Sequence, residues 1–216
     1  MDHQYVVKFE RYFEDPENAY MLLELCSNNV RVHFLLRSHL NVYAYNILCT
    51  TLYYVQSMSE LLKRRRKIAE VEVRCYISQL ITSIQYLHSQ LVIHRDLKLG
   101  NLFLDSELRV KVGDFGLAAK LTHVNEKRRT ICGTPNYIAP EILEGKEGHS
   151  FEVDIWSAGV VMYTLLIGTP PFESKDVKST YKRILCNSFS FPSHIHVSED
   201  AKSLIRSILQ VPYSVT

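Results

Sequence analysis

Two short motifs contain residues whose types and spacing suit chemistry on a charged substrate. Residues 94–101 read His-Arg-Asp-Leu-Lys-Leu-Gly-Asn, which places the carboxylate of Asp96 two residues before the ammonium group of Lys98. An Asp-Phe-Gly triplet begins at Asp114, thirteen residues after Asn101. A carboxylate can accept a proton from a reacting hydroxyl, and amide and carboxylate oxygens are the ligands that Mg²⁺ prefers. These side chains therefore predict a site for proton transfer and magnesium binding.

A helix and two short strands are expected to position these motifs. Apolar residues at helical spacing predict an amphipathic helix just ahead of the first motif. Residues 102–104 and 110–112 predict short strands on either side of a turn, and the second strand leads into Asp114. Residues 154–167 are nearly all apolar and predict a buried helix that ends at Gly168, too short for a membrane span. The stripe of the first helix consists of Val73, Ile77, Leu80, Ile81, Ile84 and Leu87.

The N-terminal region predicts strands rather than helices. Residues 7–13 alternate between two sets of side chains, as in a half-buried strand. Residues 15–18 read Asp-Pro-Glu-Asn, which is typical of a turn, and the run at 20–25 is short and mainly apolar.

Composition indicates one globular domain. The chain has 216 residues, 46% of them apolar, and a formal net charge of +2, which gives no sign of a nucleic-acid partner. The basic run at 63–67 is expected to be a solvated helix end or loop. Five cysteines without CxxC or zinc-ligand spacing predict reduced thiols in a cytosolic or nuclear protein. No signal peptide is visible at the N-terminus.

The order and spacing of the motifs resemble those of protein kinases. Residues 94–101 resemble the catalytic loop, residues 114–116 the metal-binding triplet, and Ala-Pro-Glu at 139–141 the end of the activation segment. The lysine within Asp-Leu-Lys-Leu-Gly-Asn resembles serine/threonine kinases rather than tyrosine kinases.

A finer resemblance is to the polo-like serine/threonine kinases. It is carried by residues 7–15, 23–26 and 128–141, and it extends over roughly 5–29 and 57–210. The resemblance implies an α+β, protein-kinase-like fold, formed mainly by the helical C-lobe with a two-strand remnant of the N-lobe. It also implies ATP-dependent phosphorylation of protein substrates on serine or threonine, in a cell-cycle role, by a monomer without a nucleic-acid or membrane partner.

The resemblance implies a catalytic or metal-binding role for four residues. Asp96, Lys98 and Asn101 are the expected catalytic residues, with Asp96 accepting the proton of the substrate hydroxyl and Lys98 reaching the transferring phosphate. Asn101 and Asp114 are the expected ligands of Mg²⁺ on the ATP phosphates.

Four further residues are expected at the nucleotide. By resemblance, Leu23 is the gatekeeper, the backbone of Glu24 and Cys26 holds adenine, and Phe103 forms the floor of the pocket. An ordinary core role for Phe103 remains the alternative.

The activation segment is expected to contain two functional threonines. Thr130 lies at the position of an activating phosphosite, where a phosphate could pair with Arg95. Thr134 is expected to lie against Asp96 and Lys98 and to help select a serine or threonine substrate. Asp154 resembles the buried carboxylate that anchors the catalytic loop.

Residues 1–216 depart from the family pattern at the N-terminus. The first glycine is Gly100, so no glycine-rich phosphate loop precedes the catalytic loop. Val6-Val7-Lys8 resembles the phosphate-binding lysine motif, but the hinge follows Lys8 too closely for the intervening elements. Lys8 is therefore expected to be a solvated strand residue. This chain itself is expected to be inactive, and a kinase-derived interaction module that does not turn over is the competing interpretation.

The expected organisation is a partial kinase domain. Residues 1–29 are assigned to N-lobe strands and hinge, 30–56 to a non-family insert, 57–210 to the C-lobe and 211–216 to a non-family tail. The insert has no clean period and is expected to extrude from the hinge. Its first and last residues, Val30 and Gln56, permit the GT and AG of a retained intron, and a genuine insertion is the alternative.

The sequence also departs from the family pattern after residue 210, which affects a glutamate pairing and the expected localisation. An Asn-Pro-Glu-Asp-Arg-Pro-type turn does not follow residue 210, so the arginine that normally pairs with the glutamate at Glu141 is missing from this sequence. Cytoplasmic or nuclear localisation is expected, without centrosome or kinetochore targeting, because the sequence contains no polo box.

Overall fold

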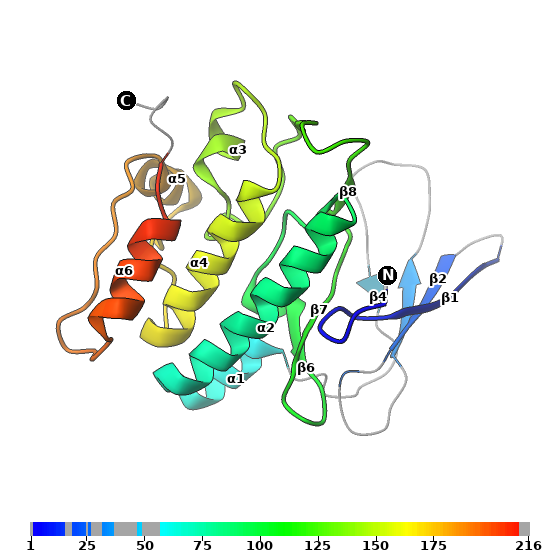
Figure 1. Cartoon of the computed structure of the whole chain (residues 1–216), viewed down its shortest axis with the longest axis horizontal. Helices are drawn as coiled ribbons and strands as arrows, with labels where there is room; N and C mark the ends of the chain where they lie inside the picture. The colour runs from blue at the N-terminus through cyan, green and yellow to red at the C-terminus, as the bar shows by residue number, and fades with distance from the viewer. Residues whose placement is uncertain are drawn as a thin grey trace.

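The computed structural model of the chain describes residues 2–15, 19–24, 26, 32–36, 47–48 and 57–211. Figure 1 shows a small antiparallel sheet on one side of the β6–β7 ribbon and a group of helices on the other side. The expected α+β fold with a mainly helical C-lobe is confirmed.

The N-terminal sheet begins with the expected hairpin. β1 (Phe9–Glu14) pairs with β2 (Ala19–Leu23), with Glu14 opposite Ala19 and a register shift between Phe9 and Arg11. The alternation of residues 7–13 predicted one buried face, and this was wrong for β1, because all of its residues are exposed. Alternation separates two faces, but an element must cover one of them to bury it.

Two further strands extend this sheet. β3 (Val32–Leu36) pairs along the whole of β2, and β4 (Ile47–Leu48) pairs with the end of β3, all antiparallel. Residues 32–36 and 47–48 of the segment expected to extrude from the hinge thus pair within this sheet, which has four strands where a remnant of two was expected. The sequence of β3, Val-His-Phe-Leu-Leu, does not alternate, so its pairing could not be seen as a period of two. The other residues of this segment and residues 212–216 lie outside the described part.

Two helices lead to the catalytic motif. α1 (Met58–Arg65) begins at a capping box formed by Ser57 and Glu60, and the basic run that ends it is exposed, as expected. α2 (Glu70–Ser89) is the predicted amphipathic helix. Its stripe is buried or partly buried except at Ile81, which is exposed, so that part of the prediction was wrong.

Two pairs of short strands and a 3-10 turn surround the motif. β5 (Val92–Ile93) pairs with β8 (Ala119–Lys120), and β6 (Leu102–Leu104) pairs with β7 (Val110–Val112), all antiparallel. The bounds of β6 and β7 are those predicted. A 3-10 turn, η1 (Leu99–Asn101), joins the catalytic loop to β6. The N-terminal segment lies against this ribbon, because Val7 N donates to Val112 O at 2.8 Å.

The centre of the helical part is α4 (Glu152–Ile167), the predicted buried helix, which ends at Gly168. It packs against α2 and against α6 (Glu199–Ile208), while α3 (Pro140–Glu144) packs against α5 (Val177–Leu185). A Cβ at Gly159 would lie 2.6 Å from Ile208 Cγ2, so the close approach of α4 and α6 requires glycine there. Among the described residues, no helix has the length and apolar character needed to cross a membrane.

Candidate active site

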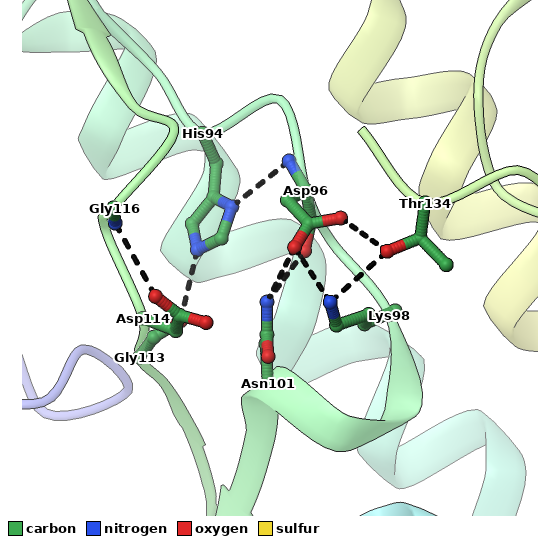
Figure 2. A network of polar contacts seen from close by, with 8 residues as sticks. All are labelled: His94, Asp96, Lys98, Asn101, Gly113, Asp114, Gly116 and Thr134. Atoms are coloured by element: carbon green, nitrogen blue, oxygen red, sulfur yellow. Dashed lines mark hydrogen bonds and ion pairs between the residues drawn. The ribbon is translucent and has the colours of Figure 1, made fainter. Parts of the chain in front are cut away.

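The carboxylate of Asp96 lies at the centre of a network of polar contacts (Figure 2). Its Oδ1 accepts a hydrogen bond from Thr134 Oγ1 at 2.6 Å, and its Oδ2 lies 2.7 Å from Lys98 Nζ. Asn101 Nδ2 donates both to Oδ2, at 3.1 Å, and to the Asp96 carbonyl, at 2.9 Å. Asp96 and Asn101 are buried, whereas Lys98 is partly exposed. The structure thus brings three predicted site residues and Thr134 together at one carboxylate.

The catalytic loop is fixed to α4 by a second carboxylate. Asp154 is completely buried and accepts the backbone N–H groups of His94 and Arg95, each at 2.9 Å. Its Oδ2 also lies 2.8 Å from His88 Nε2, at the end of α2. A carboxylate with these partners can hold the turn at Arg95, where φ is 67°. The anchoring position expected for Asp154 is the one observed.

His94 connects the catalytic loop to the metal-binding triplet. Its Nδ1 accepts from Asp96 N at 3.3 Å, and its Nε2 lies 3.0 Å from Gly113 O. These two contacts require a neutral ring with the proton on Nε2, because Nδ1 must be an acceptor and the carbonyl needs a donor. The ring also contacts Phe115, with centroids 4.9 Å apart. His94 orients backbone rather than substrate, a role that its place in the motif could have suggested but the sequence analysis did not assign.

Asp114 follows β7 and is exposed next to this network (Figure 2). Its φ of 59° belongs to the left-handed region, and its Oδ1 accepts Gly116 N at 3.3 Å. Gly113 N donates to Asn101 O at 3.0 Å, which holds the start of the triplet next to the end of the catalytic loop. Figure 2 shows Asp114 beside Asn101, which in turn contacts Asp96, while a shared metal site of the three residues stays a prediction.

The donors fit a magnesium ion that also binds phosphate. Asn101 Nδ2 is engaged by Asp96, which leaves Oδ1 as its free ligand atom, and Asp114 presents an exposed carboxylate. Within the described ranges, no group of three or more His, Cys, Asp or Glu residues is arranged to hold a metal ion. Two oxygen donors without a full protein cage suit Mg²⁺, which keeps several ligands from water or phosphate.

The expected nucleotide residues lie where β2 ends and on the β6–β7 ribbon. Leu23 and Phe103 are partly buried, and Cys26 is buried. Glu24 N donates to Lys8 O at 2.8 Å, so the β1–β2 ladder continues to this residue. Burial, and then the charge of Glu24, raises the pKa of the Cys26 thiol to about 12, which makes it an inert thiol at neutral pH.

The activation segment passes close to the catalytic loop. Gly133 has a φ of 119°, and a Cβ there would lie 3.0 Å from Arg95 O, so glycine permits the approach that places Thr134 at Asp96. Thr130 is exposed. The guanidinium of Arg128 is engaged by Lys120 O at 2.6 Å and by Glu126 at 3.0 Å. Arg95 donates through Nε to Leu117 O at 2.7 Å.

Glu141 is a half-buried carboxylate at the start of α3. Burial, followed by the negative charges of Glu152 and Glu144, raises its pKa above the usual value. No lysine, arginine or histidine among the described residues lies within ion-pair distance of Glu141.

One contact could not have been predicted from the motifs. Lys111 in β7 forms an ion pair with Glu24, with Nζ 2.6 Å from Oε1. Glu24 was expected to act through its backbone alone, and Lys111 was part of a strand pattern. Because the two residues lie far apart in the sequence, only information that relates positions 24 and 111 to each other could have predicted their contact.

Comparison with known proteins places this site in a family. A model of the protein kinase domain matches residues 1–214. The chain is 53% identical over 207 residues to a probable serine/threonine-protein kinase, CCRP1, of Zea mays, a match covering 96% of this chain and 29% of that protein. It is 50% identical over 212 residues to the cell cycle serine/threonine-protein kinase CDC5/MSD2 of Saccharomyces cerevisiae, covering 98% of this chain and 26% of the relative.

A vertebrate relative gives the same result. The chain is 49% identical over 210 residues to the serine/threonine-protein kinase PLK1 of Xenopus laevis, which covers 97% of this chain and 30% of the relative. The chain therefore spans between a quarter and a third of the length of these three curated relatives. With the kinase-domain match, the shared motifs and the Asp96 network, the chain belongs to the polo-like serine/threonine kinases of the protein kinase family.

Proposed function

We propose that this chain provides the catalytic side of a site that transfers the γ-phosphoryl group of ATP to serine or threonine hydroxyls of protein substrates. The observation that supports this most directly is the buried carboxylate of Asp96, in contact with Lys98, Asn101 and Thr134. Phosphoryl transfer needs a positioned base, a cation near the transferring group and oxygen ligands for a metal, and these residues supply all three.

Asp96 acts as the base in this proposal. The substrate hydroxyl oxygen forms a bond to the γ-phosphorus, the bond from that phosphorus to the β–γ bridging oxygen breaks, and the hydroxyl proton passes to Asp96. Lys98 lies 2.7 Å from the same carboxylate and places a positive charge beside the transferred group. Thr134 contacts both residues, through a hydroxyl 2.6 Å from Asp96 and 3.0 Å from Lys98, and lies where it can discriminate among acceptor hydroxyls.

Asn101 and Asp114 would hold Mg²⁺ on the triphosphate. When bound, the ion neutralises phosphate charge and fixes the orientation of the γ-phosphoryl group. The hydrogen bonds from Asn101 to Asp96 connect one metal ligand to the base, so both are positioned by the same loop.

The base of the nucleotide binds at the end of β2. Because the N–H of Glu24 is used by Lys8, its carbonyl is the group available to the adenine amino group, and Cys26 N–H is the corresponding donor. Leu23 lines the back of this site as gatekeeper and Phe103 forms its floor. Thr130, exposed in the activation segment, is the phosphosite that regulates the enzyme. The enzyme works as a monomer in the cytoplasm or nucleus.

Residues 1–216 alone are expected to turn over too slowly to measure. Their first glycine is Gly100, and Lys8 is exposed and paired with Asp2 rather than placed at the site. This leaves Lys98 and the metal ligands to hold a triphosphate, and loss of positioning costs up to about 7–11 kcal/mol of barrier lowering. The same observation favours a second function for the 216-residue chain, binding of kinase partners or substrates without turnover.

The test is radiolabelled phosphate transfer to casein by four proteins. They are residues 1–216, the same residues with Asp96→Asn, a chimera that adds the glycine-rich loop and lysine strand of a polo-like relative before Asp2, and that chimera with Asp96→Asn. We expect activity only in the unsubstituted chimera. If the chimera stays active with Asp96→Asn, the proposed role of Asp96 is contradicted. If residues 1–216 are active and Asp96→Asn abolishes that activity, the expectation that residues 1–216 are inactive is contradicted.

A further inference from the structure

The pair of Lys111 and Glu24 differs from the other ion pairs of lysine or arginine in the described residues. Its side chains are 13% and 22% exposed, whereas in each of the other pairs at least one side chain is 30% exposed or more. Exposed pairs contribute little because water screens them, whereas a charge withdrawn from water needs its partner. Removing one partner of this pair should therefore destabilise the protein more than the same change in any of the other pairs.

The two partners come from elements that border the proposed adenine site on different sides. Lys111 lies in β7 directly opposite Phe103 in the β6–β7 register, and β7 leads into Asp114. Glu24 follows β2, and its backbone N–H is held by Lys8 O. Lys111 thus connects the ribbon that carries the proposed floor to the segment whose backbone is proposed to bind the base.

The surroundings of the pair leave Glu24 dependent on this lysine. Glu24 Oε1 is buried, and the ammonium of Lys111, 2.6 Å away, is the one group among the described residues that compensates its charge. Cys26 is buried nearby, and the charges of Glu24 and Lys111 act on its pKa in opposite directions. The pair and both proposed backbone contacts to adenine therefore form one compact group.

We propose that Lys111 is a positioning residue for nucleotide binding, which holds Glu24 at a fixed place relative to Phe103 through its ion pair with the Glu24 carboxylate. This inference rests on the proposed function, because it takes adenine as the ligand. Lys111 does not touch the reacting atoms. Its effect is on the binding of the base and not on the transfer step.

The first test measures the tether without any nucleotide. Hydrogen exchange of the Glu24 amide, followed by NMR in residues 1–216, reports opening of the hydrogen bond to Lys8 O. Lys111→Met keeps the aliphatic stem but removes the charge, and we expect exchange about tenfold faster. Arg109→Met is the matched control, because Arg109, whose side chain is 43% exposed, forms an ion pair with Asp105 at the turn of the same ribbon. Equal hydrogen-exchange rates of the Glu24 amide in the wild type and Lys111→Met would contradict the proposal that the ion pair holds Glu24 in place.

The second test separates positioning from simple charge neutralisation. The probe is adenosine, which carries the base without phosphates, titrated by NMR into the wild type, Lys111→Met, Lys111→Arg and the double variant Lys111→Met/Glu24→Gln. We expect the Kd to rise about tenfold in Lys111→Met and to recover in Lys111→Arg. In the double variant the unpaired carboxylate is gone, so the melting temperature should recover while the Kd stays high.

The outcomes distinguish this inference from the proposed function. If the double variant regains both stability and affinity, Lys111 only neutralises Glu24 and the positioning role is overturned. If the wild type binds no adenosine, the adenine site of the proposed function fails, and the role of Lys111 at it fails too. The exchange rates then still report whether the tether exists.

Discussion

Thr134 Oγ1 donates a hydrogen bond to Asp96 Oδ1 at 2.6 Å and also accepts one from Lys98 Nζ at 3.0 Å. The hydroxyl of the activation segment therefore completes a ring of contacts with the two proposed catalytic side chains. A shift of the activation segment must change the position of the base, which connects loop conformation to chemistry through one side chain.

Substitution of Thr134 tests this connection. Thr134→Val in the active chimera removes a hydrogen bond to a charged group and should lower kcat about tenfold or more, since such bonds contribute about 1.5–3 kcal/mol. Thr134→Ser keeps the hydroxyl and should retain most of kcat. Steady-state rates for both variants decide the matter, and a loss in Thr134→Ser as large as that in Thr134→Val would contradict a specific role of the hydroxyl, because serine keeps it.

Asp154 should be important for stability as well as for the loop. Asp154→Ala leaves the buried N–H groups of His94 and Arg95 without an acceptor, and we expect the free energy of unfolding to fall by about 3–5 kcal/mol. Urea denaturation measures this loss. His88→Phe removes only one contact of the carboxylate and is the comparison variant, for which a smaller loss is expected.

Glu141 should make the protein less stable as the pH rises. Its pKa in the folded state lies above the usual value of 4.5, so the folded state binds the proton more tightly than the unfolded state does. Ionisation of Glu141 therefore costs more free energy in the folded state than in the unfolded state. This loss of stability is absent well below pH 4.5 and is fully present above the folded-state pKa. Glu141→Gln should therefore be more stable than the wild type at neutral pH, with the difference vanishing in acid. Melting temperatures of both proteins between pH 4 and 8 test this, and a constant difference would contradict it.

Thr130 should respond to charge. In the chimera, Thr130→Asp should raise the rate of peptide phosphorylation and Thr130→Val should lower it, because a phosphate of about −2 charge can pair with arginines near the segment. Arg128 is already engaged by Lys120 O and Glu126, which makes Arg95 and Arg129 the expected partners. Equal rates for both variants would remove Thr130 from regulation.

The segment at 30–56 should contribute to the sheet. β3 pairs along the whole of β2, so deletion of residues 30–56 would leave one edge of β2 without hydrogen bonds. We expect faster hydrogen exchange of the amides at Met21 and Leu23 in the deletion variant, because the N–H of Glu24 faces Lys8 and the alternation along β2 turns these two amides toward β3. Unchanged exchange there would show that the sheet does not depend on the segment.

The sequence allowed the catalytic cluster to be predicted, because Asp96, Lys98 and Asn101 lie in one short loop. The helix before this loop and the strands β6 and β7 were also predictable, since their periods report burial directly. The exposure of β1 was not, because alternation does not reveal what covers a strand. The Lys111–Glu24 contact was not either, because two charged residues far apart in sequence carry no local signal of pairing.

Gly159 has a consequence for how related chains can diverge. The contact of α4 with α6 uses the missing side chain of this residue, and a methyl group there would meet Ile208 at 2.6 Å. Leu204, exposed on α6, is free of such a limit. Leu204 can therefore be exchanged in a single mutation. A larger residue at Gly159 is tolerated only after Ile208 has been replaced by a smaller residue, so the packing of α4 against α6 sets the order of mutations at positions 208 and 159.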